Sequence, residues 1–313
     1  MNSTTKRLAL IAVALAAPQI ASAVIIDNDI ATGTLGSWSV DVQTGGESRS
    51  ADLTANRLAS GDTTTEDVLF DYFTYIDTGS GGVRLSGTAP VSTGDDELTS
   101  TGSFSGSAGN TIDWSAVSSI ADGSSVMVNT FTFTAQTGTL GNLSLFQYMD
   151  EDIEGVSDDV FFTRGTAAGL DLELFTVDND EVYGVSHSGA LDVSQGLVDA
   201  MFAGWAACTY NNMKGAISGG TQSVSTTGDL CGLLNGPFNH PQVGTAYGPQ
   251  DIVSVLAWDV SVNATSATII TTIGGVPDVS DIPDDNGVPA PATVLLLGVG
   301  LIDGRGRQGR IRT

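Results

Sequence analysis

Basic side chains are scarce in this sequence. The 313 residues include 11 Lys and Arg against 36 Asp and Glu, a formal net charge of −25. Six basic residues and one acidic residue lie in the two end segments, so the body from Val24 to Val288 holds 35 acidic and five basic residues, a net charge of −30. Nucleic-acid binding needs a basic surface, and an anionic membrane surface repels such a chain. We therefore exclude nucleic acid as a partner of the body.

Long hydrophobic runs are also missing from the body, and the first short one belongs to an export signal. Lys6 and Arg7 precede the apolar run LALIAVALAAPQI, and Ala21-Ser22-Ala23 supplies the small residues that signal peptidase requires. A short membrane anchor is the alternative, but a proline and a glutamine interrupt the run, which is shorter than the roughly 18 residues needed to span a bilayer. We predict a signal peptide over residues 1–23, cut after Ala23.

Cysteine and histidine are almost absent. Cys208 and Cys231 are the only cysteines, and they would lie outside the cytoplasm once the chain is exported. An even count in an oxidising compartment predicts one disulfide, which would stabilise the fold by roughly 3 kcal/mol. The alternatives are a catalytic thiol or a metal site, but a thiol nucleophile needs a histidine partner and the chain has only His187 and His240.

The C-terminal segment, residues 288–313, has three parts. A Pro-x-Pro turn (Pro289, Ala290, Pro291) precedes an apolar stretch of 11 residues, Ala292 to Ile302, and four arginines follow. The apolar stretch is a short membrane-seeking segment, and positive side chains after such a segment stay on the cytoplasmic side. A buried C-terminal strand is the alternative, but it would not explain the arginines.

This ending resembles the PEP-CTERM sorting signals of exopolysaccharide-producing Gram-negative bacteria. The matching residues are Val288-Pro289-x-Pro291-Ala292-Thr293, the Leu295–Leu301 run and the arginines, with Ala290 where the family usually has Glu. The resemblance implies that the segment enters the inner membrane transiently and is processed there by an exosortase. It also implies delivery to the cell envelope, the cell surface or the extracellular matrix. Such tails occur on many unrelated proteins, so the resemblance does not predict an activity for the body.

The body has the pattern of an all-β protein. Its hydrophobic content is sufficient for a core, and turn residues arrive every eight to twelve positions or so, as in a sandwich or barrel. We predict a β-sandwich, jelly-roll or supersandwich-like, over residues 24–275, either as one large sandwich or as two smaller ones. Phe131 and Phe133 should share one strand face, and Trp258 should point into the core. The clearest predicted strands cover residues 68–76, 126–135, 170–177, 252–262 and 267–273.

Two segments depart from the strand pattern. Leu197, Met201 and Trp205 are four residues apart, which predicts one amphipathic helix over residues 192–208 with Asp192 or Ser194 as its N-cap. Residues 276–287 are rich in proline and aspartate and lack periodicity. They are predicted to form a linker that holds the body away from the membrane.

The densest acidic cluster is a candidate calcium loop. Ca²⁺ takes 6–8 oxygen ligands, and flexible loops with carboxylates at alternate positions and a central glycine supply them. The match to an EF-hand is partial, because the twelfth position lacks the bidentate Glu and the flanking residues are strand-like. The alternative is a solvated acidic turn, and residues 178–181 form a weaker second candidate of the same kind. The predicted ligands are Asp150, Asp152, Glu154, Asp158 and Asp159.

Catalytic motifs are weak. The segment from Gly184 to Gly189 contains Ser186 but misses the G-x-S-x-G spacing by one residue, and His187 is predicted to be a surface residue on the opposite strand face. Glycoside hydrolysis needs only two carboxylates, and 36 acidic residues give no way to choose a pair. A tryptophan such as Trp205 can stack on a sugar ring, but core packing is the favoured role.

We therefore expect a non-enzymatic, exported structural or interaction protein of the envelope or the biofilm matrix. Its processing partners would be signal peptidase and an exosortase, and exopolysaccharide is a candidate ligand. The alternative is a secreted carbohydrate-binding module or carbohydrate-active enzyme on a β-sandwich.

Overall fold

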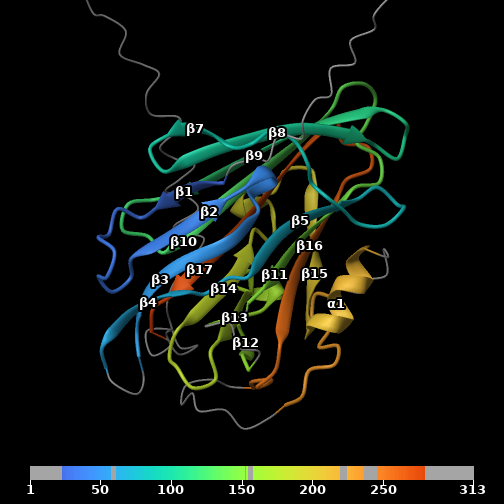
Figure 1. Ribbon diagram of the computed structural model, residues 1–313. Helices are drawn as coiled ribbons and strands as arrows, with labels where there is room; N and C mark the ends of the chain where they lie inside the picture. Colours follow the sequence, from blue (N-terminus) through green and yellow to red (C-terminus); the bar gives the residue numbers. More distant parts are fainter. Residues whose placement is uncertain are drawn as a thin grey trace, which may run out of the picture.

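The fold is a β-sandwich of two large antiparallel sheets, which confirms the predicted class (Figure 1). It is seen in a computed structural model that describes residues 23–57, 61–151, 153, 158–218, 224–235 and 245–278. The predicted signal before Ala23, the sorting segment and the linker beyond Asp278 lie outside the described residues.

The first sheet, sheet A, contains nine strands. Two of them lie off the main path, where β4 (Thr63–Asp67) pairs with β3 and β6 (Val83–Arg84) pairs with β5. The main path runs, in spatial order, through β1 (Val24–Asp27), β2 (Trp38–Val42), β3 (Ser48–Asn56), β5 (Asp71–Asp77), β11 (Ser144–Asp150), β16 (Ile252–Val260) and β15 (Ala200–Thr209).

The second sheet, sheet B, contains eight strands and faces the first. Their spatial order is β12 (Val160–Arg164), β13 (Glu173–Val177), β14 (Gly184–Gly189), β17 (Ser266–Val276), β10 (Val126–Ala135), β9 (Thr111–Ile120), β8 (Glu97–Ser105) and β7 (Val91–Gly94). The longest predicted strands coincide with strands of sheets A and B. β10 has the predicted bounds, whereas β5 begins three residues later than predicted.

The inner faces of both sheets pack two apolar clusters between them. In β10 every second residue is buried, so Phe131 and Phe133 lie on the inner face as predicted. Trp258 of β16 is fully buried in the same cluster, and its indole N–H donates to the carbonyl of Ala190 (2.7 Å). The second cluster forms around Trp38 and its neighbours from β2 and β3. Burying such large side chains supplies most of the driving force for folding, at about 1.5–3 kcal/mol for each.

Buried polar side chains also lie between the sheets and join them by hydrogen bonds. The Asn129 amide donates to the carbonyl of Gly46 (3.2 Å). The Thr271 hydroxyl donates to Gln147 (3.5 Å) and lies 3.1 Å from the hydroxyl of Tyr72. Because these bonds are directional, they align the two sheets more strictly than apolar contact does. We call this set, extended by the contact of His187 with Ser254, the polar layer.

A short helix, α1 (Tyr210–Ser218), covers part of the outer face of sheet A (Figure 1). Its Met213 and Ile217 are buried in a third apolar cluster with outward side chains of β5, β11 and β16, such as Tyr148 and Val253. Sheet A is therefore packed on both faces here, which explains why β16 is buried almost throughout.

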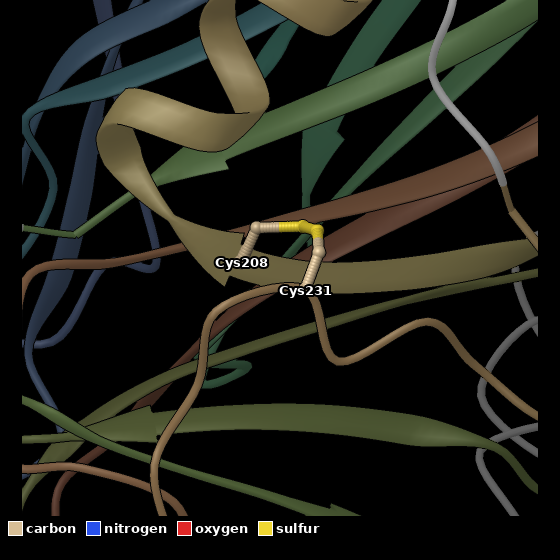
Figure 2. Close-up of a disulfide and its surroundings, with 2 residues drawn as sticks. All are labelled: Cys208 and Cys231. Atoms are coloured by element: carbon tan, nitrogen blue, oxygen red, sulfur yellow. A yellow bond between two sulfur atoms is a disulfide. The ribbon is translucent and has the colours of Figure 1, made fainter.

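The predicted disulfide is confirmed: Cys208, at the end of β15, is bonded to Cys231 (Figure 2). The bond ties the chain that follows α1 back onto β15. The backbone of this returning segment also hydrogen-bonds to β15, through Ser225 and Asp229 against Trp205 and Ala207. The disulfide thus fixes a segment that has little regular structure of its own.

The predicted helix over residues 192–208 is wrong. Asp192 does cap a helical turn, because its carboxylate accepts from the backbone N–H of Ser194 (2.8 Å), but this turn is a 3-10 helix of three residues, Val193–Gln195. Gly196 and Asp199 then take positive φ values of 100° and 50°, which end any helix, and the chain continues as β15. Leu197 is buried whereas Met201 is exposed, so the spacing of four does not mark one face.

Candidate functional site

A surface hollow lies where an edge strand of each sheet meets the other. β12 ends the order of sheet B and β15 ends that of sheet A, and the rings of Phe161 and Trp205 join them across the sandwich, 5.9 Å apart. Beside this contact the surface encloses a volume of about 600 Å³. That volume lies in the range of small-molecule binding sites.

The hollow has an apolar floor and a hydroxyl-bearing rim, with no charged side chain among the described residues that line it. Alanine and glycine complete the rim. The floor is formed by buried side chains of β15 and of the connections before β13 and after β14: Leu172, Leu191, Phe202 and Trp205. The rim carries four exposed threonines: Thr163, Thr166, Thr226 and Thr227. Sequence reasoning placed Trp205 on a helix in the core and did not predict this hollow.

Both walls of the hollow are held by local hydrogen bonds. On one wall, Thr166 accepts from the backbone N–H of Gly169 (2.9 Å), and its own N–H donates to Asp171 (2.8 Å). On the other wall, Gly228 has a φ of 85°, and a Cβ there would overlap the Trp205 ring. Glycine therefore lets the turn carrying Thr226 and Thr227 approach the indole.

A histidine, a serine and a glutamate meet inside the sandwich. His187 Nδ1 lies 3.0 Å from the Ser254 hydroxyl, which in turn donates to Glu151 (3.4 Å), and Thr176 donates to the same carboxylate oxygen (3.1 Å). All are fully buried. The prediction of His187 as a surface residue is therefore wrong: its strand, β14, lies between β13 and β17 in sheet B, and its side chain faces sheet A.

Burial determines the charge of this group. It lowers the pKa of His187 to about 3 and raises the pKa of Glu151 well above its ordinary value, with the nearby Asp150 adding to the rise. No substrate can reach a fully buried histidine and serine, and β14 runs through the sheet rather than into a strand-to-helix turn. The group belongs to the polar layer and not to a hydrolase site.

The structure buries part of the candidate calcium loop. Asp150 ends β11 and accepts from the hydroxyl of Tyr148 (3.0 Å), and Asp159, directly before β12, is buried. Asp152 and Glu154 lie outside the described residues, so calcium binding here stays a prediction.

Described residues of the two candidate acidic segments, the loop from Asp150 to Asp159 and residues 178–181, lie together. Val160 of β12 pairs with Val177 of β13, which puts Asp159 beside Asp178 at the end of this hairpin. Burial raises the pKa of Asp178 to about 7, and Asp180 and the charge of Asp158 contribute. Residues 178–181 lie in the connection between β13 and β14, as expected for a hairpin turn.

A third acidic group was not predicted. Asp29, Asp96 and Asp122 come from the connections β1–β2, β7–β8 and β9–β10, and each places a carboxylate oxygen within 4.8 Å of the other two. Partial burial and the charges of Asp29 and Asp27 raise the pKa of Asp96. The three carboxylates could hold a metal ion. Long stretches of chain separate them, and only the pairing of the strands brings their turns together.

Comparison with solved structures gives distant similarities. No family model and no curated protein matches the chain. A bacterial glucoamylase complexed with acarbose has a TM-score of 0.44 and 11% identity over 89% of this chain and 38% of its own. A GalM/aldose epimerase homologue from C. elegans has a TM-score of 0.39 and 8% identity, and the match covers 81% of this chain and 99% of the homologue. The 4-alpha-glucanotransferase from Thermococcus litoralis has a TM-score of 0.34 and 5% identity, and the match covers 80% of this chain and 37% of the glucanotransferase.

This chain spans little more than a third of the glucoamylase and glucanotransferase chains. Similarities at these TM-scores carry no conclusion about the activity of the present chain.

The buried histidine predicts a specific acid sensitivity. The pKa of His187 is about 3 in the folded protein and about 6.5 when unfolded, so the stability it contributes is complete above pH 6.5 and is lost as the pH falls towards 3. The free energy of unfolding of the wild type should therefore fall faster than that of His187→Gln between pH 6.5 and 4. The difference should approach about 1.4 kcal/mol per pH unit in urea titrations. Parallel curves for the two proteins would contradict the assignment.

Proposed function

We propose that the protein is an exported, non-enzymatic interaction protein of the envelope or extracellular matrix of a Gram-negative bacterium, delivered there by PEP-CTERM sorting. The observation that carries the proposal is the Cys208–Cys231 disulfide, because such bonds form and persist outside the cytoplasm. In addition, β1 begins at Val24, directly after the expected cleavage site, so the mature chain would start within sheet A. No helix among the described residues has the length and apolarity to cross a membrane.

The arrangement of polar groups favours binding over catalysis. The contact of His187 with Ser254 is inaccessible, and no carboxylate belongs to the described lining of the hollow, whereas glycoside hydrolysis needs two. The partners in this proposal are signal peptidase and an exosortase during processing, and exopolysaccharide at the final location. The inner membrane holds the chain only transiently, through residues 292–302.

Removing the sorting segment tests this proposal. A chain that ends before Val288 lacks the Pro-x-Pro turn, the apolar stretch and the arginines, so we expect it to appear as soluble protein in the periplasm or the medium. Fractionation and immunoblotting in a strain with an intact exosortase measure this. The matched variant Ala290→Glu restores the residue usual in the family and should reach the same fraction as the wild type. Identical fractionation of the truncated and full-length chains would refute sorting by this segment.

We propose further that calcium stabilises the body through the group formed by Asp29, Asp96 and Asp122. Three converging carboxylates in a body of net charge −30 repel one another, and Ca²⁺ accepts such oxygens in flexible geometry, whereas Mg²⁺ demands a tighter octahedron. The predicted loop from Asp150 to Asp159 is the competing location.

Thermal melts locate the ion. Calcium should raise the Tm of the wild type more than magnesium or sodium of equal ionic strength does, and Asp96→Asn should abolish this excess. If calcium is a hundredfold above its Kd, the gain is about 2.7 kcal/mol. Asp113→Asn, an exposed carboxylate outside both groups, serves as the control and should respond like the wild type. Loss of the excess in Asp158→Asn instead would move the site to the predicted loop, and equal shifts for all salts would rule out a specific site.

A further inference from the structure

The hollow between β12 and β15 differs in charge from the rest of the molecule. The body carries a net charge of −30, yet the described lining of the hollow has no charged side chain. A cationic ligand would find no carboxylate among these residues, and an anionic ligand would be repelled by the field of the whole body. The charge distribution therefore selects a neutral ligand.

The floor and the rim select the chemistry of that ligand. A sugar ring presents an apolar C–H face and polar hydroxyls around its edge. The floor offers apolar and aromatic surface from Leu172, Leu191, Phe202 and Trp205, and the rim offers threonine hydroxyls that can donate and accept. Ligand sites of this kind combine a mostly apolar lining with a few polar groups that fix orientation. A wholly apolar ligand would use the floor and leave the rim without a role.

The position of the hollow suits a polymer. It lies between two edge strands and its rim threonines are exposed, so one segment of a polymer could occupy the floor. Both walls are fixed, one by the Thr166 turn and the other by the segment that the Cys208–Cys231 bond ties to β15. We propose that this hollow binds a short segment of a neutral polysaccharide. The inference rests on the proposed function in one respect, because delivery to the matrix would bring the protein to such a ligand.

The test measures binding of the full, oxidised chain to named polysaccharides. Affinity electrophoresis in gels that contain soluble starch, mixed-linkage β-glucan, mannan or polygalacturonate compares three neutral polymers with one polyanion. We expect retardation by at least one neutral polymer and none by polygalacturonate. Equal or stronger retardation by polygalacturonate, or no retardation by any neutral polymer, would overturn the proposal.

Blocking variants locate the binding. Ala168 is exposed at one wall and Thr227 at the other, so Ala168→Trp and Thr227→Trp each add bulk to the hollow without replacing a buried residue. Each should weaken binding at least tenfold. Ala108→Trp adds the same side chain at an exposed turn between β8 and β9 and should bind like the wild type. Two blocking variants from opposite walls keep the test valid if one of them does not fold, which its melting curve reveals.

The outcomes separate this inference from the proposed function. Wild-type affinity in both blocking variants would place the binding elsewhere and overturn the assignment of the hollow. Displacement of the polysaccharide by a long-chain fatty acid at lower concentration than by oligosaccharide would show an apolar ligand and overturn it as well. Neither result depends on where the protein is delivered, because the assay uses purified protein, whereas the fractionation of the truncated chain does not depend on any ligand.

Discussion

The alignment of the two sheets depends on the hydrogen bonds of the polar layer. Apolar contact is not directional, so clusters of Phe, Leu and Ile on the two inner faces would permit several relative positions of the sheets. The hydrogen bonds from Asn129 to Gly46 and from Thr271 to Gln147 each form at only one position of sheet B relative to sheet A. A typical bond of this kind contributes only about 1 kcal/mol net, but leaving a buried partner unpaired costs about 1–3 kcal/mol. A shift of one sheet relative to the other would therefore leave several buried polar groups unpaired, and each would raise the free energy of the folded state.

The glycine at position 46 shows how closely this alignment is specified. Its φ is 70°, and a Cβ would lie 2.7 Å from the Asn129 amide oxygen. Glycine thus serves both the turn between β2 and β3 and the approach of the Asn129 side chain from the opposite sheet. Once the sheets are aligned, the edge strands β12 and β15 stand opposite each other, and Phe161 meets Trp205. The hollow lies beside that contact.

The all-β class could be predicted because strand periodicity and turn residues are local properties of the sequence. The inward position of Phe131, Phe133 and Trp258 followed from the same alternation. The disulfide could be predicted from the cysteine count together with the export signal. These inferences needed no knowledge of which strands pair.

The wrong predictions concern residues whose structure depends on which strands pair. The segment from Leu197 to Trp205 has helical spacing, but β16 offers it an edge to pair with, and Gly196 and Asp199 interrupt a helix. His187 was predicted to be a surface residue because it lies on the strand face opposite Ser186, yet its strand lies within sheet B and its side chain contacts Ser254 of sheet A. The hollow and the Asp29–Asp96–Asp122 group combine residues far apart in the chain, so only the strand order reveals them.

We propose that the end segments of this oxidised, acidic body direct its export and sorting. The central claim of this proposal is that the protein acts outside the cytoplasm after both ends have been processed. Intact-mass spectrometry of the native protein, recovered from the envelope and the medium, tests this claim most directly. The account predicts a chain that begins at Val24, lacks the residues after the Pro289–Pro291 turn and has Cys208 and Cys231 oxidised. A species that retains Met1 and Thr313 with both thiols reduced would contradict it.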